Sequence, residues 1–284
     1  MAQLPVPARF LTKVSRMLPD LRPLMWLCIS LLWLPTAQAQ TADPLLQKFA
    51  SEFVQIRPGE APYAGGKVTL GAQGKGQLPV VQVEIGGEFR IARYEVTQEL
   101  YEAVMGKNPS RWKGPRNSVE LMTVPEAEEF CRRATDGLRR LKLLEDGQRV
   151  RLPTEVEWEY CCRAGTVTRY SFGDEATAAG DEGNKATLLD PYAWHTGNAA
   201  GNDPPVGALK PNPWGLYDMH GYLSEFVTAD ERLSEAVKPD AGLPVILRGG
   251  SWKDHHSLLT SSARKQMPAD TKDDAVGFRC VIGR

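Results

Sequence analysis

The stretch from Asp218 to Glu225, which reads DMHGYLSE, holds the residues best suited to bind a hard metal ion. Its two carboxylates flank a turn that contains Gly221, and such a turn can direct several backbone carbonyls toward one point. Ca²⁺ takes about six to eight oxygen ligands from carboxylates and carbonyls, so the stretch is a candidate calcium site. The same spacing also occurs in ordinary capped turns with solvated acids.

A second group of potential ligands lies in the segment SWKDHH at residues 251–256. Asp254, His255 and His256 offer carboxylate and imidazole ligands, which suit Zn²⁺, iron or Cu²⁺ rather than Cu⁺. Neighbouring side chains on an extended segment point to opposite faces, so we expect only one of the two histidines to reach a given ion. A surface turn or a contact with substrate is the alternative interpretation.

The first 39 residues have the pattern of an export signal. Four basic residues precede an apolar run from Leu24 to Leu34, and Pro35 and the small-residue sequence AQA at residues 37–39 follow it. The run has 11 residues, fewer than the roughly 20 that span a membrane, which favours a cleaved signal over a retained anchor. We therefore expect residues 40–284 to form one domain in the periplasm, with no membrane span.

The composition of that domain argues against a nucleic-acid-binding protein. Removal of residues 1–39 would leave 30 basic and 34 acidic side chains, and such an acidic balance repels phosphates. The basic residues between positions 132 and 142 are explained by the solvated face of a helix. No flavin or nicotinamide fingerprint appears in the sequence.

Four cysteines follow the expected signal, and an exported chain can keep cysteines as disulfides. They are Cys131, Cys161, Cys162 and Cys280. The adjacent Cys161 and Cys162 could form a strained vicinal disulfide, which would be easily reduced and open to a redox role. The alternative, which we favour, is a pair of thiols buried on a helix.

Local patterns predict short strands, three helices and one long loop that would position these groups. Alternating apolar residues indicate strands at residues 53–56, 80–85 and 89–94. Capping residues and capping boxes mark the helix starts. The expected helices run from Thr97 to about Met105, from Thr123 to about Leu138, and from Thr154 to a left-handed stop at Gly165. Residues 169–213 show neither helical nor strand periodicity. A loop of this length in a compact domain indicates a functional segment or one that is held by a bound metal ion.

Four separated stretches together resemble one known family. They are RLPTEVEWEY at residues 151–160, PNPWGLYDMHG at 211–221, LRGGSW at 247–252 and GFRC at 277–280. In this order, and over residues 50–284, the chain resembles the formylglycine-generating enzyme, or sulfatase-modifying factor, family. The resemblance implies an α+β fold, a loop-rich variant of the C-type-lectin-like fold with few helices and small twisted sheets.

The resemblance also implies metal-binding and disulfide positions. The ligands of a structural calcium ion would be the side chains of Asp218 and Glu225 and the carbonyls of Gly221 and Leu223. Asn184, Asn198 or Asp203 would serve a second calcium ion in the long loop. Cys131 and Cys280 match a disulfide of the family, whereas Cys162 matches a half-cystine whose partner is missing, because Ser261 and Ser262 occupy that neighbourhood.

A peptide-binding cleft is implied as well, and its residues would be Arg248, Ser251, Trp252 and Arg264. For Arg248 we favour the alternative of a structural ion pair. The family's oxidases carry two copper-binding cysteines between the positions of Ser251 and Gly277, where this chain has none and Asp254 stands at the first. We therefore expect no copper–thiolate site and no formation of formylglycine.

Two functions remain open for such a protein. Exported relatives without the cysteine pair include a periplasmic protein required for oxidative maturation of the siderophore pyoverdine, which suggests an oxidoreductase acting on a peptide-derived ring. The base would be Glu225, Asp254, His255 or His256, and a redox metal, dioxygen or another periplasmic maturation protein would take the electrons. The alternative is a non-catalytic regulatory or binding protein, like a relative in the type VI secretion phosphorylation pathway.

Overall fold

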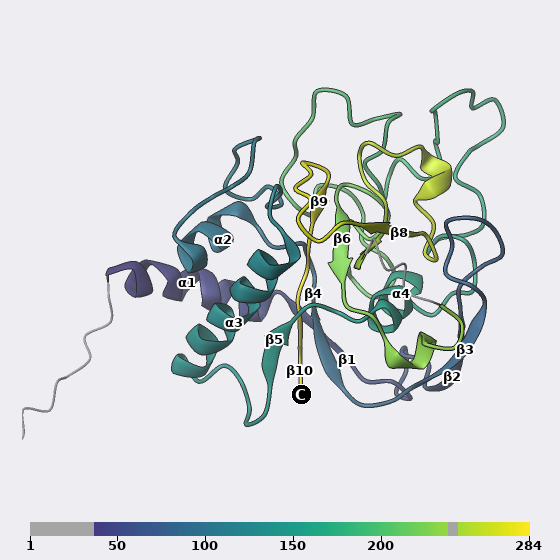
Figure 1. Ribbon diagram of the computed structural model, residues 1–284. Coiled ribbons are helices and arrows are strands. Elements are labelled where there is room, and N and C mark those ends of the chain that lie inside the picture. Colours follow the sequence, from purple (N-terminus) through teal and green to yellow (C-terminus); the bar gives the residue numbers. More distant parts are fainter. Residues whose placement is uncertain (1–36, 238–243) are drawn as a thin grey trace, which may run out of the picture. The chain divides into compact units, whose positions relative to one another are not determined.

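Three helices pack against one another in the computed structural model, which describes residues 37–237 and 244–284 (Figure 1). They are α1 (Ala37–Ser51), α2 (Gln98–Met105) and α3 (Val124–Arg140). Phe130 of α3 stacks on Tyr101 of α2, with 5.6 Å between the ring centroids, and meets the edge of Phe49 of α1 at 6.3 Å. These aromatic contacts place the centre of one apolar core between the helices.

The N-terminal part of the chain was only partly anticipated. The expected export signal at residues 1–39 lies outside the described residues as far as residue 36, and α1 begins at Ala37. Helix α1 was not predicted from the sequence. Among the described helices, none is both long enough and apolar enough to cross a bilayer.

The predicted helix starts agree with the structure. Thr123 and Glu126 form the capping box of α3, which runs two residues beyond the expected end to Arg140. Helix α4 (Glu155–Arg163) begins after Thr154, whose hydroxyl accepts a hydrogen bond from the backbone amide of Glu157 at 3.2 Å. The expected stop at Gly165 needs correction, because Ala164 already adopts the left-handed conformation with a φ of 47°.

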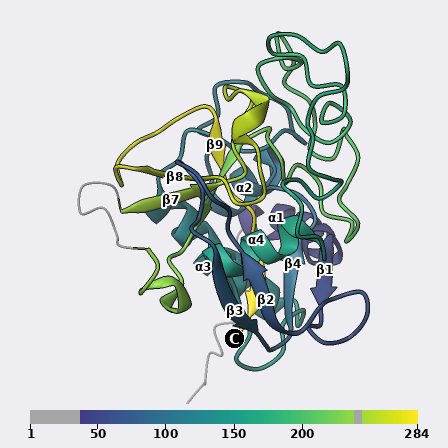
Figure 2. The same ribbon diagram turned by 90° about the vertical axis from the view of Figure 1, so that its right-hand side faces the viewer.

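The described strands form two four-stranded sheets and one hairpin. The first sheet has the order β1 (Phe53–Ile56), β4 (Phe89–Ala92), β10 (Val281–Gly283) and β5 (Arg149–Arg151), with antiparallel neighbours. The second has the order β8 (Arg264–Met267), β7 (Val245–Arg248), β6 (Ser224–Val227) and β9 (Val276–Gly277), with β6 and β9 parallel. The hairpin of β2 (Gly66–Leu70) and β3 (Val81–Ile85) lies beside α4 (Figure 2).

A long irregular segment separates α4 from β6, as the sequence predicts. Residues 164–223, all of them described, form turns and a single bridge between Tyr170 and Gly173. The segment surrounds a small apolar cluster that includes Leu189 and Leu259. The few helices, the small sheets and the irregular backbone confirm the predicted α+β fold.

The buried guanidinium of Arg279, in the segment between β9 and β10, joins the two sheets. Its Nε and Nη2 donate to the two carboxylate oxygens of Glu225 in β6 at 2.7 and 2.6 Å. Its Nη1 donates to the carbonyls of Ala92 and Arg93 at the end of β4, and Nη2 also donates to the carbonyl of Tyr217. All five guanidinium N–H groups are therefore used, which compensates the cost of burying the charge.

Substitution of Arg279 by methionine tests this connection. Arg279→Met leaves Glu225 buried without its charge partner, and breaking a buried ion pair on one side costs about 3–5 kcal/mol of unfolding free energy. Urea denaturation followed by circular dichroism measures the loss. As a control, Arg132→Met removes pairs on the exposed face of α3 and should change stability by less than about 1 kcal/mol. Equal denaturation midpoints for Arg279→Met and wild type would contradict the assignment.

Candidate functional site

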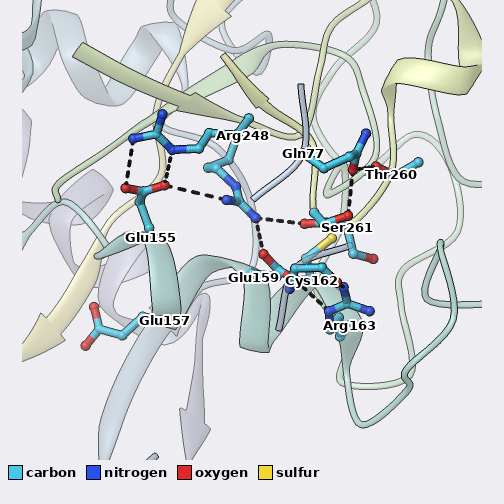
Figure 3. Close-up of polar contacts among 12 residues, drawn as sticks. Gln77, Glu155, Glu157, Glu159, Cys162, Arg163, Arg248, Thr260 and Ser261 are labelled. Carbon is cyan, nitrogen blue, oxygen red and sulfur yellow. Dashed lines mark hydrogen bonds and ion pairs between the residues drawn. The ribbon is translucent and has the colours of Figure 1, made fainter. Parts of the chain in front are cut away.

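The segments RLPTEVEWEY and LRGGSW meet in a buried charged network (Figure 3). Nη2 of Arg248 in β7 donates to Glu159 at 2.5 Å and to the carbonyl of Ser261 at 3.0 Å, and its Nη1 lies 3.7 Å from Glu155. Arg264 of β8 donates from Nε to Glu155 at 2.7 Å. Both arginines, assigned to substrate by the resemblance, are thus held by carboxylates of α4, and Arg248 forms the structural ion pair that we favoured.

Cys161 and Cys162 of α4 are free, fully buried thiols, and Cys162 lies beside this network. Burial raises the pKa of Cys162 to about 12 and holds the pKa of Cys161 well above its ordinary value. A protonated thiol is a poor nucleophile, so the structure agrees with the buried-thiol interpretation rather than with a redox role. Ser261 lies beside Cys162 (Figure 3).

Cys131 of α3 and Cys280 lie next to each other in the core, as the resemblance implies. Their sulfur atoms are 3.8 Å apart and both are free thiols in this structure. A disulfide has an S–S length of about 2.05 Å, so the bond itself stays a prediction.

A buried cluster of three carboxylates surrounds Arg279. Glu95, Asp218 and Glu225 are each at most 3 % exposed. Burial, followed by the charges of Glu225 and Asp218, raises the pKa of Glu95 well above its ordinary value. Burial also raises the pKa of Asp218 to about 6, against the opposing effects of the Gly207 amide and Arg279. One guanidinium cannot balance three ionised carboxylates, so these upward pKa shifts mean that part of the cluster tends to bind protons, whose place a divalent cation would take.

The turn that carries the predicted calcium ligands has an unusual backbone. Asp218, Gly221 and Tyr222 all adopt left-handed conformations, with φ values of 58°, 109° and 71°. A Cβ atom on Gly221 would lie 2.4 Å from the carbonyl oxygen of Trp194, so only glycine fits there. The oxygen-only set of donors suits a hard cation such as Ca²⁺. Oε2 of Glu225 accepts hydrogen bonds from both Arg279 and Trp158, whereas Oε1 accepts from Arg279 alone and keeps a lone pair for a cation.

Backbone carbonyls would have to complete such a site. Within residues 37–237 and 244–284, no three His, Cys, Asp or Glu side chains form a group that could hold a metal ion. The expected ligand set contains two carboxylates and two carbonyls, and the residues of the turn therefore fit the ion only if Gly221 and Leu223 supply their main-chain oxygens.

Asp254 holds the turn that follows β7. Its Oδ2 accepts hydrogen bonds from the backbone amide and the hydroxyl of Ser251 at 2.9 and 2.8 Å, and its Oδ1 pairs with Lys265. Glu225 instead contacts Arg279 and Trp158. Of the side chains considered as the catalytic base, Asp254 therefore lies in this turn and Glu225 lies in the buried ion pair with Arg279.

The expectation that His255 and His256 point to opposite faces was wrong. Their ring centroids lie 3.9 Å apart. The reason is local, because the backbone is not extended here but turns into the 3₁₀ helix η2 (His256–Leu258), for which His255 is the N-cap.

Trp252 lines a cavity of about 240 Å³, which we call the aromatic pocket. The pocket lies between the turn of residues 218–225, the long loop and the segments around residues 112–120 and 274. Its aromatic side chains are Trp112, Trp194, Tyr222 and Trp252, and its acidic side chains are Glu120, Asp203 and Asp274. Of the predicted cleft residues, Trp252 is the one that lines this pocket.

Two buried polar atoms of the pocket residues have no hydrogen-bond partner in the described structure, namely Oε2 of Glu120 and Nε1 of Trp194. Oε1 of Glu120, in contrast, accepts from the backbone amides of Arg111 and Trp112 at 2.5 and 3.2 Å. Burial raises the pKa of Glu120 although these two amides act to lower it. Buried unpartnered polar atoms are costly, which favours a site that a ligand completes.

Most of this pocket was not predicted from the sequence. Asp203 entered only as a possible calcium ligand, whereas its carboxylate accepts hydrogen bonds from Asn117 at 2.6 Å and from the Tyr222 hydroxyl at 3.3 Å. Glu120 could have been noticed in the sequence, because it is an acidic residue between the apolar residues Val119 and Leu121.

Comparison with known proteins places the chain among its relatives. Residues 47–284 match the sequence profile of the sulfatase-modifying factor enzyme 1-like domain. The chaperone protein LppX of Paenibacillus barcinonensis is 29% identical over 226 residues, which cover 68% of this chain and 80% of that protein. The formylglycine-generating enzyme of Bos taurus is 31% identical over 143 residues, or 46% of this chain and 38% of the enzyme. The chain therefore spans less than half the length of that enzyme.

A solved structure shares the fold. PvdO from Pseudomonas aeruginosa superposes with a TM-score of 0.63 and 23% identity, over 82% of this chain and 94% of PvdO. The profile match covers most of the sequence, and the fold agrees with it. The chain belongs to the sulfatase-modifying factor enzyme 1-like family.

Proposed function

We propose that this protein is exported to the periplasm and acts there in the oxidative maturation of a peptide siderophore. The aromatic pocket would hold a ring of the precursor. The observation that carries the proposal is the pair of unused polar atoms, on Glu120 and Trp194, among the aromatic residues of that pocket. The likeness in fold to PvdO and the expected signal at residues 1–39 support it.

The chemistry assigned to the pocket is a dehydrogenation of a partly reduced ring. The ring loses two electrons and two protons, and dioxygen accepts them and becomes hydrogen peroxide, so that the reaction balances. Glu120 would take the proton that leaves the ring, because burial brings its basicity closer to that of a base working near neutral pH. Trp112, Trp194 and Trp252 would orient the ring and exclude water.

A non-catalytic binding role is the second candidate. The oxygens of Glu225 and Asp254, two of the bases first considered, are engaged by Arg279, Ser251 and Lys265. A relative, LppX, is named a chaperone. In this role the loop of residues 169–213 and the aromatic pocket would hold a protein or peptide, as in a regulator of a secretion pathway.

We also propose that a calcium ion binds at the turn of residues 218–225. The ligands would be the carboxylates of Asp218 and Glu225 and the carbonyls of Gly221 and Leu223. The support is the cluster of three buried carboxyl groups around the single guanidinium of Arg279. The ion would stabilise the turn and take no part in the oxidation.

Calcium is expected to raise the melting temperature of the chelated protein. A ligand present at about 100 times its Kd stabilises the folded state by about 2.7 kcal/mol, which differential scanning fluorimetry detects. Asp218→Asn removes one ligand charge and should reduce the response to calcium. Asp146→Asn changes an exposed residue and should leave the response intact. Identical melting of the wild-type protein with calcium and with a chelator would refute the calcium site.

Oxidation of a reduced siderophore precursor is the direct test of function. Incubation of the purified protein with the precursor in air should convert it to a product that lacks two hydrogens, with an equal amount of hydrogen peroxide, both followed by mass spectrometry and a peroxide assay. Trp252→Ala removes a wall of the pocket and should weaken binding by about tenfold or more. Val167→Ala, at an exposed position, is the matched control.

The outcomes separate the two candidates. Binding of the precursor without oxidation would favour the non-catalytic role, and no binding of the precursor would contradict the proposed oxidation.

A further inference from the structure

We infer that the aromatic pocket selects a planar cationic group, such as an amidinium or a guanidinium, over neutral and anionic groups of the same shape. The inference rests on the proposed function, because it names the chemical class of the group that the pocket would receive. It follows from the charges, the aromatic walls and the size of the pocket.

The charged side chains that line the pocket are all acidic. Its lining, all within the described part of the chain, includes three carboxylates and no Lys, Arg or His. Asp274 pairs with Lys253 and lies 3.6 Å from Arg111, so its charge is largely balanced. Glu120 and Asp203 differ, because their hydrogen bonds come from neutral amides and a hydroxyl. A monovalent cation in the pocket would balance one of these two negative charges.

The aromatic walls add a second attraction for a cation. A positively charged group over the face of an indole or phenol ring is attracted by the negative electrostatic potential of the ring. Two indoles of the pocket already attract cations, since Arg111 lies 4.8 Å from the centre of the Trp112 ring and Lys253 lies 5.3 Å from that of Trp252. Neither cation lines the pocket, so the lining itself contains no positive charge.

The size and the unpartnered atoms define the shape of the ligand. The cavity of about 240 Å³ is smaller than the roughly 300–1,000 Å³ of sites for drug-sized ligands, so it admits one ring-sized group. Oε2 of Glu120 would accept an N–H of the cation, and Nε1 of Trp194 would donate to a neighbouring carbonyl oxygen. A planar nitrogen cation attached to a peptide meets both requirements.

A series of three isosteric probes tests the selectivity on the wild-type protein. Isothermal titration calorimetry would compare benzamidine, which is a planar cation, with neutral benzamide and anionic benzoate. Benzamidine is expected to bind at least about tenfold more tightly than benzamide, because a hydrogen bond gains strength when one partner is charged. Benzoate should bind most weakly. Equal affinities, or tighter binding of benzamide, would overturn the inference.

Variants then locate the preference in the pocket. Glu120→Gln keeps the shape of the side chain and one acceptor oxygen but removes its charge. It should weaken benzamidine by about tenfold and leave benzamide unchanged. Glu102→Gln makes the same charge change on an exposed position of α2 and should have no effect. Circular dichroism checks folding, and Asp203→Asn serves as a second pocket variant.

Failure of the inference and failure of the proposed function give different results. If the precursor binds and is oxidised while benzamidine shows no preference, the cation selectivity is wrong and the function stands. If benzamidine is preferred and the precursor neither binds nor reacts, the proposed substrate is wrong and the selectivity stands.

Discussion

The buried pairing of Arg279 with Glu225 is the constraint on which the two sheets and the turn between them depend. Glu225 belongs to β6 and ends the turn that begins at Asp218, so the ion pair fixes where that turn lies. Trp158 of α4 donates its indole N–H to the same carboxylate at 2.9 Å, which ties the helix to the pair. Attraction between charges is stronger in the protein interior than in water, and for the same reason an unpaired charge there is costly.

Polar contacts hold the segment that follows β7. At Asp254, where the resemblance implies a cysteine in the family's oxidases, this chain has a carboxylate that holds Ser251 and pairs with Lys265, and Arg248 and Arg264 bind the carboxylates of α4. These contacts engage the charged side chains of this region, which is why we propose the chemistry in the neighbouring pocket. The aromatic pocket, which Trp252 connects to the same loop, is the place that the structure offers.

Local signals in the sequence predicted local structure well. The capping boxes at Thr123 and Thr154 depend on residues three positions apart, and α3 and α4 begin where they indicate. The pocket could not be found in this way, because Trp112 and Trp194 come from distant segments that only the folded chain brings together. Glu95 was missed for the same reason, since its role depends on carboxylates far along the chain. Short-range geometry failed once as well, at the histidine pair, where a turn replaced extended backbone.

Tyr222 belongs to two regions at once. Its ring lines the aromatic pocket, and its main chain lies between Gly221 and Leu223 in the turn of the proposed calcium site. Occupation of both proposed sites would restrict the same residue, and the two binding equilibria would then be thermodynamically linked. Linkage of this kind is reciprocal: if the ion tightens the hold on the ring-shaped ligand, that ligand tightens the hold on the ion by the same factor. If calcium binds as proposed, its concentration would in that way change the affinity of the pocket for its ligand.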